Sequence, residues 1–174
     1  MSREFDRLVL TRRTVKAYAP GPVPHETLDE LFNLARWAPN HHLSNPWRFR
    51  VLGPAALAAL KDAAGPEAAA KLDRAPTLVA ASVIGSNGVD PVADDEDLAA
   101  GAAAVFIVLL GAHARGLAGY WRTPGVLRTP AGRAACSIAD GERVLGLIHL
   151  GVGRGPGKAP PERAPLEEVR SFLD

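Results

Sequence analysis

Apolar residues recur at helical spacing in two stretches of the first half of the chain and alternate or cluster in two others. The helical stretches predict a first helix that ends near Arg12 and an amphipathic helix over 25–37. Alternation of apolar and charged positions predicts a strand over 47–52, and an uncharged, partly β-branched run predicts another over 77–84. The Ala-rich stretch 54–72 between these strands predicts a helical segment that is broken once by a Gly-Pro pair.

An uncharged run over 98–114 is the most apolar segment of the second half. It falls just short of the roughly 20 residues that span a bilayer, and its many Ala and Gly residues favour a fully buried helix over a membrane segment. The acidic stretch 90–97 is predicted as a loop whose last carboxylates favour the start of that helix. A short strand at 120–121, a strand over 143–151 and a final helix over 165–173 complete the prediction.

The order of these elements predicts an α+β fold. Helices and strands interleave without a strict βαβ rhythm, so a three-layer α/β/α sandwich is favoured over a doubly wound parallel sheet. Neither an internal repeat nor an interdomain linker is visible in the sequence. The 174 residues therefore suit a single domain, 1–174, with a substantial core.

Charge and composition argue against several classes of partner. Twenty Lys and Arg balance nineteen Asp and Glu, so a net charge of +1 gives no reason to expect nucleic acid or an anionic membrane as a partner. The single cysteine, Cys136, excludes an intramolecular disulfide framework and fits a reducing cytosol. The first residues, MSREFDRLVLTRR, lack the apolar core of a signal peptide. Together these features predict a cytoplasmic protein.

Common catalytic and metal motifs do not fit the chain. The tail GVGRGPGKAPPER fails as a phosphate loop, because Ala159 replaces the hydroxyl residue, and as a dinucleotide fingerprint, because Pro156 replaces the third glycine. His41 and His42 are adjacent and the other histidines offer no ligand spacing, so no metal site is predicted. No Gly-x-Ser-x-Gly motif occurs, and Cys136 is predicted to be structural.

Candidate chemistry begins at the predicted end of the first helix. The segment RRTVK, residues 12–16, gathers two guanidiniums, a hydroxyl and an ammonium there. Arginine presents paired donors that match phosphate oxygens, and Thr14 adds another donor. Taken alone, the segment is more typical of a solvated basic helix end, because cations interact favourably with the last carbonyls of a helix.

Two later segments add aromatic and polar groups. WAPNHHLSNPWRF, residues 37–49, places donors and acceptors between two prolines, where they suit ribityl hydroxyls or a ring edge. GYWRTPG, residues 119–125, places an aromatic ring, a cation and a hydroxyl at the end of a strand. For each, the alternative is ordinary packing: a helix-to-strand connection in the first case and a core aromatic in the second.

In this order and at these separations the segments resemble the FMN-dependent nitroreductase family. RRTVKAY is similar to that family's R-R-S-x-[KR]-x-[FY] opening, and APNHHLSNPWRF is similar to its A-P-S-x-x-N-x-Q-P-W-x-F stretch. GLAGYWRT, VLGLIHLGV and the ending PLEEVRSFL resemble later segments, so the likeness covers nearly the whole chain. The A-P-[DN]-H form of the loop, the W-R-[ST] element and the short length point to the compact branch of the family.

The resemblance implies an intertwined homodimer with FMN at the interface, built on a nitroreductase-like sandwich with a mixed, mainly antiparallel sheet. Arg12, Arg13 and Thr14 would hold the phosphate and ribityl chain. Lys16 would approach the pyrimidine edge of the isoalloxazine ring, around N1 and O2. The other implied FMN-binding residues are Trp37 and His41 of the partner subunit, together with Trp121, Arg122 and Thr123.

Some positions depart from the family pattern. Thr14 replaces the usual serine and keeps the hydroxyl, whereas Asn45 replaces the usual glutamine before Pro-Trp and shortens the amide by one methylene. Residues 40–43, Asn-His-His-Leu, lack the serines that larger nitroreductases have there, so the contacts of this loop with the ribityl chain are left open. Whether Arg163 or Lys158 also contacts the phosphate is open as well.

For function, the resemblance implies an NAD(P)H oxidoreductase. NADPH or NADH would give hydride to flavin N5, and a nitroaromatic, quinone or similar electron-poor small molecule would accept it in a ping-pong cycle. No catalytic side chain is required, and Lys16 would supply electrostatic support. The alternatives are a specialised flavin dehydrogenase of the same family and a flavin-binding module without turnover. The helix over 98–114 is apolar on all sides, so one side would pack against its own chain and the other would be covered by the second subunit of the homodimer.

Overall fold

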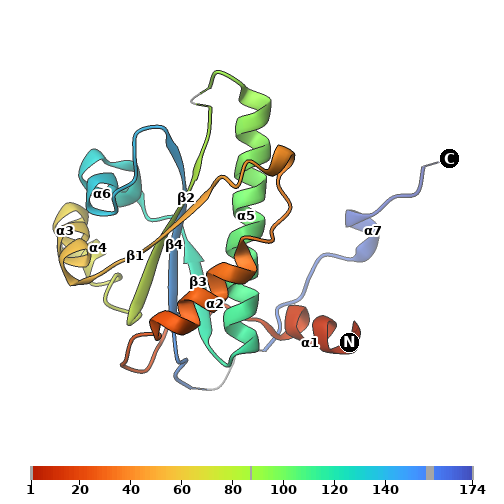
Figure 1. Cartoon of the computed structure of the whole chain (residues 1–174). Helices are drawn as coiled ribbons and strands as arrows, with labels where there is room; N and C mark the ends of the chain where they lie inside the picture. Colours follow the sequence, from red (N-terminus) through yellow and green to blue (C-terminus); the bar gives the residue numbers. More distant parts are fainter. Residues whose placement is uncertain (1, 87, 156–158, 174) are drawn as a thin grey trace.

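The computed structural model describes residues 2–86, 88–155 and 159–173. Within them a four-stranded sheet lies between two groups of helices, which gives three layers (Figure 1). The helices are α1 (Ser2–Thr11), α2 (His25–Ala35), α3 (Pro54–Ala64), α4 (Pro66–Ala69), α5 (Pro91–Ala114), α6 (Pro130–Ala135) and α7 (Leu166–Val169). The strands are β1 (Trp47–Val51), β2 (Thr77–Ile84), β3 (Ala118–Arg122) and β4 (Glu142–Gly151), and short 3-10 turns are η1 (His41–Leu43) and η2 (Gly125–Arg128).

The sheet has the strand order β1-β2-β4-β3, and all neighbouring strands are antiparallel. A parallel bridge between Thr14 and Gly119 adds a further segment beside β3. β4 bulges between its pairings with Ala81 and Ser82, and Gly146 lies at the bulge with a φ of 138°. A side chain there would come within 2.4 Å of the Arg122 carbonyl oxygen, so this position requires glycine. The arrangement confirms the predicted α+β three-layer sandwich.

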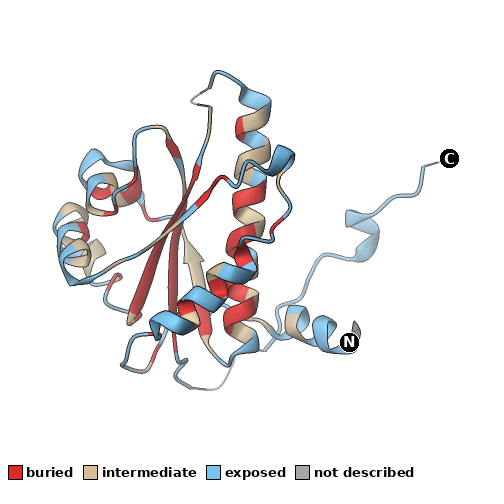
Figure 2. Cartoon of the chain, viewed as in Figure 1, coloured by how far each residue is buried: buried red, intermediate tan, exposed pale blue. Residues whose placement is uncertain are grey.

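Each face of the sheet has its own hydrophobic core. One core lies between the sheet and α2 with α5, and the other lies between the sheet and α3 with α6. Alternation along β4 supplies both, because Ile148 and Leu150 enter the first core and Leu147 enters the second. Figure 2 shows buried residues along the central strands and the inner side of α5. Burial on both faces explains why β2 is apolar without alternation.

Helix α5 differs from its prediction at its start. The stretch predicted as an acidic loop, 90–97, forms the N-cap and the first two turns of the helix instead. Asp90 is the N-cap residue and its carboxylate accepts from the backbone N–H groups of Val92 and Ala93, each at 3.1 Å. Capping and a proline at the first turn begin the helix before the apolar run does.

The apolar run of α5 is not fully buried in a single chain, although the sequence predicted that it would be. By length and composition α5 could cross a membrane, but nine of its residues are buried against the rest of the molecule. Phe106 on the opposite side is 42% exposed. The predicted final helix is also shorter than expected, since α7 covers only Leu166–Val169 and stands apart from the three layers (Figure 1).

Candidate functional site

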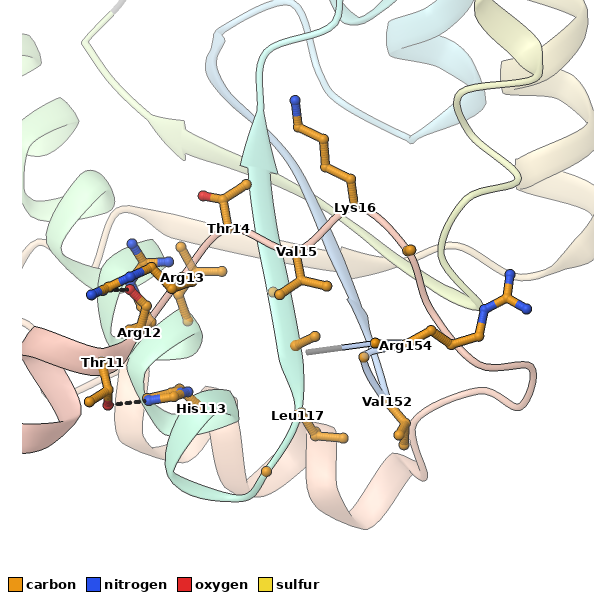
Figure 3. A pocket seen from close by; sticks show the side chains of 17 residues that line it. Thr11, Arg12, Arg13, Thr14, Val15, Lys16, His113, Leu117, Val152 and Arg154 are labelled. Carbon is orange, nitrogen blue, oxygen red and sulfur yellow. Dashed lines mark hydrogen bonds between the residues drawn. The ribbon is translucent and has the colours of Figure 1, made fainter. Parts of the chain in front are cut away.

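A cavity of about 600 Å³ opens where the chain leaves α1. Its walls come from residues 11–17, the C-terminal end of α5, the start of β3 and residues 152–155 after β4 (Figure 3). Segments far apart in the sequence therefore meet at one end of the sheet. The basic segment 12–16, singled out from the sequence, forms one side of this cavity.

Backbone pairing holds the residues that directly follow the basic segment in place. The backbone N–H of Ala19 donates to the Val152 carbonyl at 2.8 Å, and that of Arg154 donates to the Ala17 carbonyl at 3.0 Å. The Tyr18 side chain is buried between these contacts, and burial raises the pKa of its hydroxyl. The residues that follow α1 thus behave as a short edge strand rather than a loose loop.

Two arginines concentrate positive charge inside the cavity. Arg13 Nη1 donates to the Arg12 carbonyl at 2.7 Å, whereas its buried Nε has no hydrogen-bond partner among the described residues. The pKa of Arg12 is lowered, first by burial and then by the charges of Arg13 and Arg163. The part of Arg163 in the site was left open by the sequence, and its charge reaches Arg12. Lys158 lies outside the described residues. Mutually repelling guanidiniums with an unused donor favour an anionic ligand.

His113, on the last turn of α5, lines the same end of the cavity. The Thr11 hydroxyl donates to the Arg7 carbonyl at 2.6 Å, so at 2.8 Å it accepts from the His113 Nε2–H. Burial, and then the charges of Arg12, Arg13 and Arg7, lower the pKa of His113. The imidazole is therefore neutral near pH 7, and Nδ1 is its acceptor nitrogen.

Lys16 marks the other end of the cavity. Its Nζ lies 5.2 Å from the centre of the Tyr120 ring, and that ring lies 5.5 Å from the ring of His149. His149 is 1% exposed, and neither ring nitrogen has a partner among the described residues. Burial, followed by the charges of Arg122 and Arg74, lowers the pKa of His149 to about 4, so this ring is also neutral. A cation over aromatic rings suits a flat, electron-rich ligand edge.

The structure brings together four of the residues that the sequence singled out: Arg12, Arg13, Thr14 and Lys16 all line the cavity. The other five do not line it in a single chain. Trp121 packs against the core beside α5, and its Nε1 donates to the Leu145 carbonyl at 2.9 Å. Arg122 and Thr123 follow it at the end of β3.

Trp37 and His41 are not among the residues that line the cavity, and His41 lies beside the first turns of α5. Trp37 is 79% exposed, and His41 Nδ1 pairs with the Glu96 carboxylate on the first turns of α5. Ser44 donates to Asp97 at 2.6 Å in the same region, so the acidic start of α5 fixes the loop that carries His41.

Sequence reasoning missed His113 and Arg154 as cavity residues. His113 is 102 positions from its partner Thr11, and no local pattern marks it as different from other helix-end histidines. Arg154 belongs to the tail that was interpreted as a turn-rich connection, yet residues 152–155 form a wall of the cavity. Among the described residues no cluster of three or more His, Cys, Asp or Glu could hold a metal ion.

Comparison with known proteins identifies this architecture. A sequence model of the nitroreductase family matches residues 9–75, the part that contains the basic segment and the following loop. A nitroreductase-like family protein from Bacillus cereus superposes with a TM-score of 0.86, covering 98% of this chain and 96% of that one at 24% identity. The chain is therefore similar to the nitroreductase family in sequence over residues 9–75, and its fold is nitroreductase-like.

Proteins of similar length also resemble this chain in sequence. YfhC of Bacillus subtilis, provisionally named an NAD(P)H nitroreductase, is 25% identical over 92% of this chain and 90% of its own length. YdjA of Escherichia coli, with the same provisional name, is 24% identical over 83% of this chain and 85% of its own. A Desulfovibrio desulfuricans protein solved with FMN superposes with a TM-score of 0.78 at 22% identity, covering 98% of this chain and 96% of that one.

Proposed function

We propose that this chain is a member of the nitroreductase family and works as an FMN-dependent oxidoreductase. It would take electrons from NADPH or NADH and reduce nitroaromatic, quinone or similar electron-poor acceptors. The observation that carries the proposal is the cavity at the end of α1, where two guanidiniums converge and a buried Arg13 Nε lacks a partner among the described residues. The provisional names of YfhC and YdjA support the same activity, and the D. desulfuricans protein supports FMN as the cofactor.

The residues present fit FMN. About 600 Å³ is within the range of roughly 300–1,000 Å³ that small-ligand pockets occupy. Arg12 and Arg13, with Arg163 beside Arg12, would hold the dianionic phosphate, and the exposed Thr14 hydroxyl would meet the ribityl chain. Lys16, at the opposite end, would face the pyrimidine edge of the ring system. The cavity thus offers a cluster of cations at one end and a single cation over aromatic rings at the other.

When bound, the flavin supplies hydride and electron transfer between the nicotinamide and the acceptor in two half-reactions of a ping-pong cycle. The chain's own contribution is position and charge. Lys16 Nζ would stabilise negative charge at the pyrimidine edge, because a fixed cation there needs no reorganisation during the reaction. His113 lies beside Thr11 and the two arginines, at the proposed phosphate end and away from the ring, so the proton for the acceptor would come from water.

A second copy of the chain would complete the site. Apolar residues remain exposed in one chain on α5 and along the C-terminal tail: Phe106 (42%), Phe172 (82%) and Leu173 (91%). Figure 2 shows that tail exposed along its length and separate from the core. Covering such surface by a symmetric partner is favourable. In this homodimer Trp37 and His41 of the partner subunit would close over the flavin, which Trp121, Arg122 and Thr123 would also contact.

No described feature calls for a larger partner. We propose small molecules alone as reaction partners, without nucleic acid or membrane, and a cytoplasmic location. The single thiol fits that compartment: Cys136 is buried, and burial raises its pKa to about 11, so it is unreactive.

The deciding experiment follows the visible spectrum of protein purified with FMN and freed of excess cofactor. Anaerobic addition of NADPH, and separately of NADH, should bleach the flavin band, and a nitroaromatic or quinone should restore it. Retained flavin that neither donor reduces would favour the specialised dehydrogenase or the flavin-binding module instead. Protein that retains no flavin would refute the proposal.

A further inference from the structure

A second cavity, of about 550 Å³, adjoins the first on the other side of the edge segment. The two cavities share Lys16, Ala17 and Arg154. The walls of the second come from residues 16–20 and from the turn 73–76 that leads into β2. Tyr18 and the prolines at positions 20 and 76 make this wall rigid, because Tyr18 is buried and a proline ring fixes its own backbone angle.

The second cavity is lined by three cations and one acid. The acid, Asp73, is already paired: Lys61 Nζ lies 2.9 Å from its Oδ1 and 2.8 Å from its Oδ2. Arg74 and Arg154 have no ion pair and no side-chain hydrogen bond within the described part of the chain. The positive charge of Arg74 also extends to the sheet, since it contributes to lowering the pKa of His149.

This charge is separate from the phosphate end of the first cavity. Figure 3 shows Arg12 and Arg13 on the α5 side of β3, next to His113, whereas Lys16 and Arg154 project away from them. A ligand that spans from Lys16 into the second cavity would therefore meet Arg74 and Arg154 without competing for the phosphate site.

We propose that the second cavity binds the carboxylate of the electron acceptor, so that the enzyme prefers electron-poor aromatic acids over neutral aromatics of the same shape. The inference rests on the proposed function. A carboxylate fits because guanidinium groups donate in pairs to its two oxygens. Lys16 belongs to both cavities, so the ring of an acid anchored at Arg74 and Arg154 would lie next to the pyrimidine end of the flavin site.

The test compares 4-nitrobenzoate with 4-nitrobenzamide, which has nearly the same size but no charge. Wild-type protein loaded with FMN should show a higher kcat/KM for the acid. In Arg74→Gln, kcat/KM for the acid should fall by about ten-fold or more, because one charge-assisted hydrogen bond is lost. The fall should come from a higher KM, and kcat/KM for the amide should change little. Arg74→Lys should recover part of the loss, since it keeps the charge without the paired donors.

Arg128→Gln is the matched control, because Arg128 is an exposed arginine on η2 that lines neither cavity. This variant should have the wild-type kcat/KM for both 4-nitrobenzoate and 4-nitrobenzamide. Equal losses for acid and amide in Arg74→Gln, or no loss for either, would overturn the proposal. A loss confined to reactions with NADPH and absent with NADH would overturn it too, by assigning Arg74 to the nucleotide phosphate.

Failure of the proposed function is a separate outcome. If wild-type protein binds FMN but reduces neither acceptor, the oxidoreductase assignment fails while the cavity can still be tested by calorimetry. Tighter equilibrium binding of 4-nitrobenzoate than of 4-nitrobenzamide, lost in Arg74→Gln, would support the carboxylate site. Equal binding of the two compounds by wild-type protein would refute it.

Discussion

Two partly buried arginines, Arg50 and Arg13, have opposite surroundings. Arg50 Nη1 donates to the Ser82 hydroxyl at 2.8 Å, and its Nη2 lies 2.6 Å from the Glu142 carboxylate. Ser82 also donates to the other oxygen of Glu142, so the group is internally satisfied. Arg13 instead makes one bond to a neighbouring carbonyl, and its buried Nε has no partner among the described residues.

We interpret this difference as one between a residue that stabilises the fold and a residue proposed to bind a ligand. Arg50 ties β1, β2 and β4 together at the end of the sheet where β4 begins. A buried donor without a partner costs roughly 1–3 kcal/mol, so the unpaired Nε of Arg13 lowers the stability of the ligand-free protein. Such a cost is expected where a bound anion supplies the missing acceptor. Substitutions at the two places should therefore affect different properties.

The largest effect is expected from Glu142→Ala. This change leaves Arg50 without its carboxylate while the guanidinium remains partly buried, so the free energy of unfolding should fall by about 2–3 kcal/mol. FMN affinity, measured on the folded protein, should not change. Urea titration at neutral pH measures the loss, and Glu67→Ala, on an exposed pair with Lys71, provides the control with little loss.

The same carboxylate gives the stability a pH dependence. Burial raises the pKa of Glu142, but hydrogen bonds from Arg50 and Ser82 and the charge of Arg50 outweigh it and lower the pKa overall. Because the folded-state pKa lies below the unfolded one, the stabilisation is present above about pH 4.3 and is lost as the pH falls through the folded-state value. The difference between wild type and Glu142→Gln should therefore shrink in acid, and a difference that grew would contradict the pairing.

The second largest effect is expected from Arg12→Ala, on FMN affinity. Removing one guanidinium from the phosphate end should raise the Kd for FMN by roughly 10- to 100-fold, the equivalent of one charge-assisted hydrogen bond. The free energy of unfolding of the flavin-free protein should stay the same or rise, because a repulsion with Arg13 and Arg163 is removed. Quenching of FMN fluorescence measures the Kd. Arg3→Ala, on an exposed part of α1, is the control, and flavin retention like that of wild type would exclude Arg12 from the phosphate site.

Sequence reasoning located the long, regularly patterned elements of the fold and missed the short ones. Periodicity located β2 to the residue and α2 to within two residues, because burial imposes a strict pattern on both. It missed α6 and η2, which are too short for a period to show. It also misplaced the start of α5, where a capping aspartate outweighed the polar composition.

The site was predictable only where it is local. Arg12 to Lys16 lie within one segment, so their residue types marked a candidate anion site, and the family resemblance implied their individual roles. His113, Arg74 and Arg154 enter through long-range packing of helix ends and turns, which no motif marks. Arg50 and Glu142 are 92 positions apart, so no local pattern marks Arg50 as paired and Arg13 as unpaired.

Lys16→Ala sharpens the comparison at the other end of the cavity. Loss of the ammonium should leave FMN bound but make the flavin harder to reduce, with a midpoint potential lower by roughly 20–40 mV, as expected for one partly screened charge. Dye-coupled anaerobic titration measures the potential. Lys16→Arg keeps the charge, so its midpoint potential should lie close to that of wild type. An unchanged potential in Lys16→Ala would exclude the role proposed for this residue.

His113→Gln should produce the smallest effect, and it appears as a change in pH dependence. In the free protein burial and the charges of Arg12, Arg13 and Arg7 lower the pKa of His113, so the ring is neutral. A phosphate dianion offsets those charges and raises the pKa, so FMN binding should take up a proton and weaken several-fold as the pH rises from about 6.5 to about 8.5. Glutamine cannot take up that proton, so the variant should show flat affinity over the same range. Riboflavin, which lacks the phosphate, should show no such dependence with either protein. A wild-type FMN affinity that is flat with pH would place the phosphate away from His113, and Arg13 Nε would then need another acceptor.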